Sequence, residues 1–480
     1  MSNINISGYE FTDFQRDFER LEGTHSEQVR REPEVTYYDE YAKAELRDMQ
    51  PELYRQWIEG WSRSYYLREK HMDAILQYKT PNTPLTRLDT EVWQEAIDAV
   101  KNELSSLRNS RALSVITDLD QIYYVQSSAA GYGYIGAKGD IYGVNHDRAI
   151  RRAKATLYSA TARDGEGIEY TIRQTVPDVG YTRTQLADLN EKTKVRGVWG
   201  RAFHYILLEG TSARPLLESI MQGDTFIMIG CNPVIDVPRK LSEIAGNPNV
   251  KWMTAIDWSQ FDATVSRFEM NTAFDIIKEK ITFPDFDTEM AFELSRQLFI
   301  HKKIAAPDGR IYWSHKGIPS GSYYTSIIGS IVNRLRIEYL WRFKFYEGPE
   351  YCYTLGDDSL IGYKEYWDPN EIADLAKQLN WIMNPSKTEC STIPAGITFL
   401  GRTSRGSQNQ RDLKKCLRLA ILPEYPVTEG KVSAYRIQSI YEDSGSTSSV
   451  LLRLAKRLRT KYGFPTEEEI PRLHRPYTFM

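Results

Sequence analysis

A pair of aspartates occupies what we predict to be the tip of a β-hairpin. Asp357 and Asp358 follow Gly356, between two strand-like runs at 351–355 and 359–363. Glycine and aspartate tolerate the backbone conformations of tight turns, which favours a hairpin here. Adjacent carboxylates repel each other unless a cation lies between them. Taken alone, the pair fits a solvated turn as well as a metal site.

A third aspartate, Asp257, follows the strand-like run 250–256. Open sheets place reactive side chains at the C-terminal ends of strands, so we expect Asp257 to face Asp357 and Asp358 across neighbouring strands. Two divalent cations bound by the carboxylates and by substrate phosphates would remove the repulsion among the three aspartates. Two such ions can hold the attacking and leaving oxygens of an in-line phosphoryl transfer. We therefore expect two Mg²⁺ ions, for which Mn²⁺ can substitute.

A flexible loop and a helix lie between these aspartates. The loop contains Ser320 and Gly321, and a helical pattern begins at Thr325. Thr325 and Asn333 are eight positions apart and fall on roughly the same face of a helix. Asn333 together with Asp262 is suited to reading a sugar hydroxyl, the group that distinguishes RNA from DNA. A helix cap with small packing residues is the alternative.

A basic segment precedes the aspartates in the chain, at residues 191–201. In an extended strand, side chains at alternate positions point to the same side. The segment would then present several cations together, namely Lys192, Lys194, Arg196 and Arg201. Such a row can neutralise an incoming triphosphate. An exposed edge strand also carries cations, but the position upstream of the aspartates favours the triphosphate.

Residues 128–140 contain the glycine spacing GxGxxG. A dinucleotide site requires a helix directly after the glycines and an acidic residue about 20 positions further on. Here the glycine-rich loop continues to Gly143 before any helix begins, which disfavours that interpretation. We expect instead a loop that lies close to RNA, with Lys138 as a phosphate contact. The basic helix expected at 147–162 is typical of a solvated surface.

The composition is typical of a soluble globular protein of several lobes. The chain has 480 residues, of which 41% are hydrophobic, and its mean hydropathy is −0.50. A net charge of −3 means that any nucleic acid must be bound in an internal basic channel. Four scattered cysteines argue against zinc and disulfides and favour a reducing compartment. No apolar run reaches the length of a membrane-spanning helix, and the N-terminus does not resemble a signal peptide.

In their order along the chain, these segments resemble the motifs of viral RNA-dependent RNA polymerases. Asp257 and Asp262 resemble motif A, Ser320, Gly321, Thr325 and Asn333 resemble motif B, and residues 356–358 resemble motif C. Residues 192–201 are similar to the basic motif F, 379–389 to motif D, and 398–402 to motif E. The polymerases of partitiviruses, double-stranded RNA viruses of plants and fungi, are the most similar in length and in the segments near 128–140 and 192–200.

The resemblance implies a role for each residue. Asp257 and Asp357 would bind the metal ions directly and Asp358 would assist, while Lys387 of motif D would protonate the departing pyrophosphate. Ser320 and Gly321 would move to admit the nucleotide and the template. The implied contacts to RNA are Lys138, Gly317, Ser320 and Arg402.

Two positions depart from the common pattern. Gly329 stands where positive-strand polymerases have an asparagine, and Asn333 follows one turn later, as in double-stranded RNA virus relatives. Gly401 replaces the usual lysine of motif E.

The expected fold is an α/β (α+β) right hand of fingers, palm and thumb, with a palm of antiparallel strands packed on helices. We assign residues 1–245 to an N-terminal arm and the fingers, 246–275 to the palm and 276–316 to an insertion of the fingers. Residues 317–402 return to the palm, and 403–480 form a helical thumb. A basic helix at 450–462 would either follow the product backbone or form a salt-bridged surface helix.

The resemblance also implies partners and a location. Template and product RNA, nucleoside triphosphates and a capsid protein are implied, with no membrane. The chain would transcribe and replicate a double-stranded RNA genome in the virion interior and in the host cytoplasm.

Two alternatives remain from the sequence. A reverse transcriptase or DNA polymerase shares such a palm, although Asn333 with Asp262 favours ribonucleotides. A non-enzymatic, capsid-associated RNA-binding protein would need no carboxylate triad.

Overall fold

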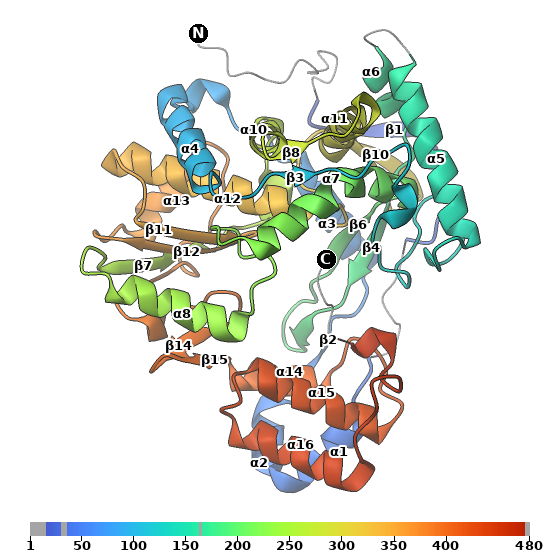
Figure 1. Cartoon of the computed structure of the whole chain (residues 1–480). Coiled ribbons are helices and arrows are strands. Elements are labelled where there is room, and N and C mark those ends of the chain that lie inside the picture. Colours follow the sequence, from blue (N-terminus) through green and yellow to red (C-terminus); the bar gives the residue numbers. More distant parts are fainter. Residues whose placement is uncertain (1–15, 30–35, 163–165, 476–480) are drawn as a thin grey trace.

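The chain forms three lobes (Figure 1). A computed structural model describes residues 16–29, 36–162 and 166–475. One lobe contains a four-stranded sheet, the second a five-stranded sheet, and the third is helical. This mixture of helices and sheets confirms the expected α+β right hand, and we refer to the lobes as palm, fingers and thumb.

The palm sheet has the strand order β11-β12-β7-β13, and its neighbouring strands are all antiparallel. Its strands are β7 (Trp252–Ala255), β11 (Tyr351–Leu355), β12 (Asp358–Tyr363) and β13 (Glu389–Ser391). Side chains alternate between its two faces, so that Leu360 packs toward α8 (Pro233–Gly246) and Ile361 toward α12 (Thr325–Phe345). The sheet is therefore covered by helices on both faces, which fixes the position of its strand ends.

The fingers sheet has the order β1-β10-β9-β4-β6, with β4 and β9 parallel and the other pairs antiparallel. Its strands are β1 (Phe18–Thr24), β4 (Asp178–Arg183), β6 (Arg196–Gly200), β9 (Lys302–Ala305) and β10 (Arg310–Ser314). Strands β9 and β10 come from the segment expected to be a fingers insertion. Strand β6 is an edge strand of this sheet. It contains one of the predicted cations, Arg196, and Lys192 and Lys194 precede it.

Helices complete the fingers and the palm. Those of the fingers and their connection to the palm are α3 (Arg68–Leu76), α5 (Val144–Thr161), α6 (Gly167–Arg173), α7 (Phe203–Gln222) and α11 (Phe286–Ile300). The palm adds α4 (Thr90–Glu103), α9 (Phe261–Thr264), α10 (Arg267–Lys278) and α13 (Pro369–Lys377). Three two-stranded pairs join β2 (Trp61–Arg63) to β5 (Leu186–Asp188), β3 (Ser110–Arg111) to β8 (Ile281–Thr282), and β14 (Thr403–Arg405) to β15 (Gln408–Gln410).

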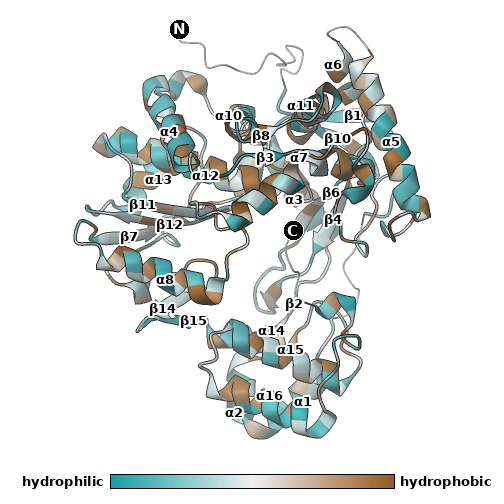
Figure 2. Cartoon of the chain, in the orientation of Figure 1, coloured by the Kyte–Doolittle hydropathy of each residue, from teal (hydrophilic) through white to brown (hydrophobic). Residues whose placement is uncertain are grey.

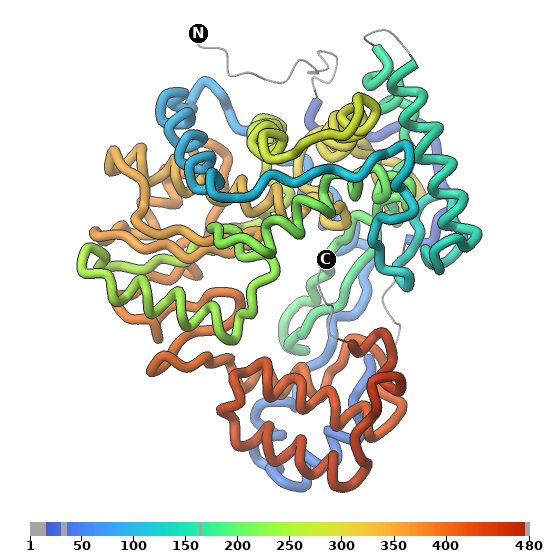
Figure 3. The backbone as a smooth tube through the Cα atoms, in the orientation of Figure 1, coloured from blue at the N-terminus to red at the C-terminus, as the bar shows by residue number. Residues whose placement is uncertain are grey.

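The thumb contains helices from both ends of the chain. Helices α1 (Glu40–Met49) and α2 (Pro51–Trp57) share one hydrophobic core with α14 (Leu413–Ile421), α15 (Gly430–Asp443) and α16 (Ser449–Tyr462). Figure 3 shows this blue N-terminal segment running among the red C-terminal helices. In Figure 2 these helices carry both hydrophobic and hydrophilic residues, as expected for helices that bury one face.

Polar contacts reinforce this arrangement of the thumb. Asp39, the N-cap of α1, accepts hydrogen bonds from Ser433 Oγ at 2.8 Å and pairs with Arg436. On α16, Arg457 and Lys461 pair with Glu45 at 2.9 and 2.8 Å. Two cations of this basic helix are thus engaged in surface ion pairs with α1.

The lobes therefore differ from the division expected from the sequence. Residues 1–245 were assigned to the arm and the fingers, but α1 and α2 pack in the thumb, and α4 and α8 pack against the palm. The apolar stripe of these helices predicts that they pack, but not against which lobe. Within the described residues, no helix combines the length and the apolar character needed to cross a membrane.

A buried ion pair joins α12 to the start of α10. Arg336 Nε donates to Glu269 Oε1 at 2.5 Å, and both side chains are fully buried. Glu269 also forms a capping box with Ser266. The Arg336 guanidinium lies 5.0 to 5.2 Å from the centres of three aromatic rings, those of Trp258, Phe261 and Trp381.

We expect Glu269→Gln to lower the free energy of unfolding by about 3–5 kcal/mol, because it leaves the Arg336 charge buried without a counter-ion. Urea unfolding monitored by tryptophan fluorescence measures this loss. Glu371→Gln serves as the control, because Glu371 forms an exposed ion pair with Lys344 at 3.4 Å and such pairs contribute less than about 1 kcal/mol. Equal losses in the two variants would contradict the role assigned to the buried pair.

Candidate active site in the cleft

The hairpin β11–β12 and strand β7 bring the three aspartates of the palm together. Residues 351–355 pair with 358–362, which confirms the hairpin, and Gly356 adopts a positive φ of 57° at its turn. Strand β7 runs antiparallel to β12, so its C-terminal end lies beside the N-terminal end of β12. Asp257 follows β7 by two residues and Asp358 begins β12. This is the juxtaposition expected from the sequence.

A cleft of about 920 Å³ lies in front of the hairpin. Asp262 on α9, Asp357 and Asp358 form part of its wall. Strand β6 and the residues before it supply cations to the same cleft, namely Lys192, Lys194 and Arg196. The structure therefore brings most of the predicted carboxylates and most of the predicted cations into one cavity.

The negative charges in the cleft affect one another. Burial raises the pKa of Asp262 to about 7, and the charge of Asp357 adds to this, whereas Arg196 opposes it. Burial raises the pKa of Asp358 to about 6, with further contributions from Asp357 and Asp257. Burial by the cleft walls, with repulsion by Asp257, also raises the pKa of Asp357, even though its side chain reaches solvent. A cation between these groups would reduce their mutual repulsion.

The donor set of the cleft fits hard divalent cations. No three His, Cys, Asp or Glu side chains within the part of the chain that the structure describes lie close enough to form a complete metal site. The carboxylates nevertheless offer only oxygen donors, which suits Mg²⁺ or Mn²⁺. Substrate phosphates commonly complete the coordination of such ions.

Asn333 is engaged inside the palm and does not face the cleft as a sugar-reading group. Its Oδ1 accepts a hydrogen bond from Trp258 Nε1 at 2.8 Å. Its Nδ2 donates to the carbonyl oxygens of Gly356 at 3.0 Å and of Asp358 at 3.1 Å. The side chain is fully buried. The expectation that Asn333 reads a sugar hydroxyl is thus replaced by a different role, in which its amide ties the aspartate hairpin to the residue next to Asp257.

Arg201, predicted to contact the nucleotide, points into the protein interior. Strand β6 ends at Gly200, so the alternation of the strand no longer applies at Arg201. Its fully buried guanidinium lies 3.7 Å from Asp178 and 3.5 Å from Glu209. The structure therefore does not bring Arg201 to the cleft.

Two residues predicted to contact RNA are also engaged within the protein. The Lys138 ammonium donates to Ser128 Oγ at 2.5 Å and to the Ala129 carbonyl at 3.0 Å. Arg402 is 6% exposed and pairs with Asp443 of α15 at 2.9 Å. Lys138 thus closes its own loop, and Arg402 joins the palm to the thumb.

The loop before α12 is docked against β6. Trp199 N donates to Ser320 Oγ at 3.0 Å, and Gly321 approaches so closely that an added Cβ would lie 2.0 Å from Trp199 O. Gly317 adopts a φ of 81° and donates to Val265 O at 2.8 Å. Thr325 Oγ1 donates to Pro319 O at 2.6 Å and so closes the loop on itself.

The sequence-based prediction missed some residues that line the cleft. Lys70 and Gln77 of the α3 region line the cleft, although their helix was expected to be scaffold. No local signal marks them, because their relevance depends on where the helix packs.

Lys387, the predicted proton donor, is exposed and is not one of the residues that line the cleft. Thr388 next to it accepts a hydrogen bond from Asp257 N at 3.1 Å and so fixes the backbone of Asp257.

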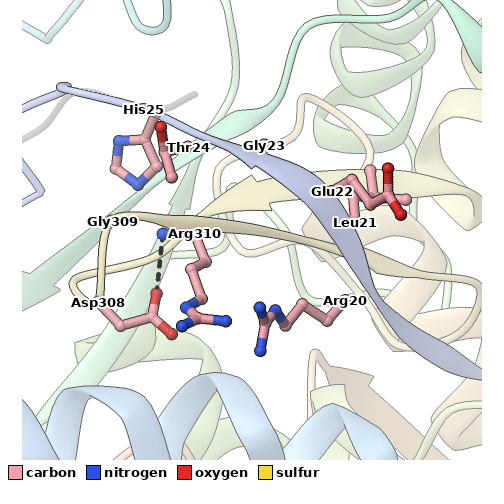
Figure 4. Close-up of a pocket in the computed structure, with 9 residues that line it drawn as sticks. All are labelled: Arg20, Leu21, Glu22, Gly23, Thr24, His25, Asp308, Gly309 and Arg310. Atoms are coloured by element: carbon pink, nitrogen blue, oxygen red, sulfur yellow. Dashed lines mark hydrogen bonds between the residues drawn. The ribbon is translucent and has the colours of Figure 1, made fainter.

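A second pocket, of about 640 Å³, lies between β1 and β10 (Figure 4). Figure 4 shows Arg20 and Arg310 next to each other, but Glu22 and Asp308 line the same pocket and offset their charge. Strand β1 is at the opposite edge of the sheet from β6. This pocket is therefore separate from the aspartate cleft.

A palm sheet with a carboxylate hairpin, enclosed by fingers and a thumb, defines the right-hand class of polymerases. Residues 37–459 match the family described as viral RNA-dependent RNA polymerase. The chain belongs to this family, as its motifs predicted.

Relatives of known sequence and structure agree with this assignment. The RNA-directed RNA polymerase of Cryptosporidium parvum virus 1 is 33% identical over 135 residues, which are 27% of this chain and 25% of that protein. The genome polyprotein of Poliovirus type 3 is 25% identical over 370 residues, 71% of this chain and 15% of the polyprotein. The chain thus spans a quarter or less of these relatives.

Two crystal structures of a human picobirnavirus RNA-dependent RNA polymerase share the fold. The insertion-loop deletion mutant has a TM-score of 0.65 at 16% identity and covers 90% of this chain, which in turn covers 89% of it. The other has a TM-score of 0.65 at 17% identity, with 89% and 88% covered.

We expect Asn333→Leu to reduce incorporation of ribonucleotides and deoxyribonucleotides by the same factor, about 10-fold or more, because it releases the hairpin rather than a sugar contact. Primer extension with each nucleotide type measures the two rates. A selective gain in deoxyribonucleotide use would instead show that Asn333 reads the sugar.

Proposed function

We propose that this chain synthesises RNA on an RNA template by two-metal nucleotidyl transfer. The observation that carries the proposal is the position of Asp257, at the end of β7, next to the hairpin that carries Asp357 and Asp358. Asp357 and Asp358 line a cleft that also contains Arg196, and Asp257 lies just behind the residues that line it. Carboxylates suit the cations that activate phosphoryl transfer, and the cations of the fingers suit the triphosphate. Membership of the polymerase family supports the same reaction.

The proposed reaction is a nucleotidyl transfer in which the aspartates hold the metal ions. The 3′-oxygen of the growing RNA forms a bond to the α-phosphorus of the nucleotide, the bond to the β-phosphate oxygen breaks, and pyrophosphate leaves. Asp257 and Asp357 would hold two Mg²⁺ or Mn²⁺ ions, with Asp358 assisting. These ions, when bound, stabilise the attacking and the leaving oxygens.

The fingers and the loop before α12 orient the substrate. Lys192, Lys194 and Arg196 neutralise the triphosphate as it enters the cleft. Asp262, whose pKa is raised, accepts or donates a hydrogen bond at the ribose. Ser320 and Gly321 position the nucleotide against β6.

Lys387 remains the proposed donor of a proton to pyrophosphate. Lys387 is exposed and lies outside the residues that line the cleft, so its side chain would have to turn toward the leaving group when substrate is bound. Gly317, at the start of the loop, is proposed to lie along the RNA.

The polymerase family and the sequence motifs support a proposal for the biological setting. We propose that the template is a double-stranded RNA viral genome, in a virus similar to partitiviruses, and that the chain works beside a capsid protein in the virion interior and the host cytoplasm. The match to the RNA-directed RNA polymerase of Cryptosporidium parvum virus 1 supports a viral polymerase.

Asp357→Asn is expected to reduce incorporation of labelled NTPs by about 1,000-fold or more, because one metal-binding charge is lost, while RNA affinity stays within about twofold. Gel-based extension and fluorescence anisotropy measure the two quantities. Asp374→Asn is the matched control, since Asp374 is exposed on α13. Equal synthesis by both variants would refute the metal assignment.

Mg²⁺ is expected to raise the melting temperature of the protein more at about pH 8 than at about pH 5.5. The pKa values of Asp262 and Asp358 are raised to about 7 and 6 in the folded protein. Their contribution to stability is therefore present at low pH and is lost as pH rises through these values, when the deprotonated groups repel each other. Mg²⁺ relieves this repulsion only where the groups are deprotonated.

Differential scanning fluorimetry with and without Mg²⁺ measures the effect. Asp262→Asn should reduce the difference between the two pH values. A shift in melting temperature that is the same at both pH values would contradict coupling between the carboxylates and the cation.

A further inference from the structure

Four buried charged side chains lie behind the loop formed by residues 317–323. Its basic members are Arg201 and Lys302, and its acidic members are Asp178 and Glu209. Arg201 lies 3.7 Å from Asp178 and 3.5 Å from Glu209, and all three side chains are at most 2% exposed. Lys302 is close enough to this group for Arg201 and Asp178 to affect its pKa. Burial raises the pKa of Asp178 and of Glu209 and lowers the pKa of Lys302 well below its usual value, whereas the charge of Arg201 opposes the rise for both carboxyl groups.

The cluster holds the first part of the loop through Lys302. Its ammonium donates to the carbonyl oxygens of Lys316 at 2.8 Å and of Gly317 at 2.5 Å. It also lies 5.5 Å from the centre of the Trp199 ring, on strand β6, which carries the cleft cation Arg196. Tyr78 adds a hydrogen bond to Ile318 O at 2.7 Å.

The cluster holds the last part of the loop through Glu209. One carboxylate oxygen accepts hydrogen bonds from Tyr323 N at 2.9 Å and from the hydroxyl of Ser322. The other faces Arg201, which itself follows β6 directly. Buried charges are costly to move away from their partners, so both ends of the loop are fixed to the same interior group.

We infer that Glu209 and Lys302, which lie outside the cleft, are positioning residues that hold Ser320 and Gly321 against β6 for nucleotide binding. The basic strand and the loop then keep one relative position, because Arg201 joins the end of β6 to the carboxylate that holds the loop. Small displacements of positioning groups are enough to slow a transfer reaction strongly. This inference rests on the proposed polymerase function.

The test compares two buried carboxylates. Glu209→Gln removes the charge that holds the loop, whereas Glu293→Gln removes a similarly buried charge that pairs with Arg296 at 3.2 Å and Lys278 at 2.7 Å. We expect Glu209→Gln to raise the KM for NTPs about tenfold while RNA affinity stays within about twofold. Glu293→Gln should leave the KM unchanged. Ser322→Ala, which removes only one donor to Glu209, should give a smaller rise.

Hydrogen exchange provides a readout that does not depend on activity. We expect faster exchange of the amides in 317–323 in Glu209→Gln and in Lys302→Met, with the α13 amides unchanged, and no change at the loop in Glu293→Gln. The inference would be overturned if Glu209→Gln had the KM for NTPs and the hydrogen exchange of residues 317–323 that the wild-type protein has. It would also be overturned if hydrogen exchange in Glu209→Gln became faster by the same factor along the whole chain. If the wild-type protein incorporates no NTP, the proposed function fails, and loop exchange alone then decides whether the anchors act as described.

Discussion

Repulsion among carboxylates in a confined cleft is the constraint on which the rest of this structure depends. Asp262, Asp357 and Asp358 all have raised pKa values because the cleft walls reduce the hydration of their carboxylates and neighbouring carboxylates repel them. Carboxylates that repel one another stay close together only if the backbone that carries them is rigidly fixed. The Asn333 amide, the Thr388 hydroxyl and the ladder between β12 and β7 supply that framework. Each acts on the backbone and leaves the carboxylates available.

The fingers provide the complementary charge from the other side. Edge strand β6 and the residues before it carry cations into the cleft, and Arg196 lowers the pKa values of Asp262 and Asp357. The cluster of Arg201, Asp178, Glu209 and Lys302 connects that strand to the loop before α12. This buried cluster therefore helps to fix the basic wall of the cleft relative to the loop and helix next to the acidic wall.

The sequence predicted the parts of this site that depend on local patterns. The hairpin around Gly356, the helix from Thr325 and the strand before Asp257 follow from turn chemistry and periodicity. It could not predict whether a polar side chain turns inward. Asn333, Arg201, Arg402 and Lys138 resemble ligand-binding residues in sequence, but buried partners far away in the chain engage them. For the same reason, nothing local shows that α1 and α2 complete the thumb.

The central claim is that the aspartates of β7 and of the hairpin bind two cations jointly. Crystals grown with Mn²⁺ and a non-hydrolysable NTP analogue would test it most directly through anomalous scattering. We predict two peaks about 3.5–4 Å apart, between Asp257 and Asp357 and next to the analogue phosphates. A map with bound analogue and no peak between these two residues would contradict the account.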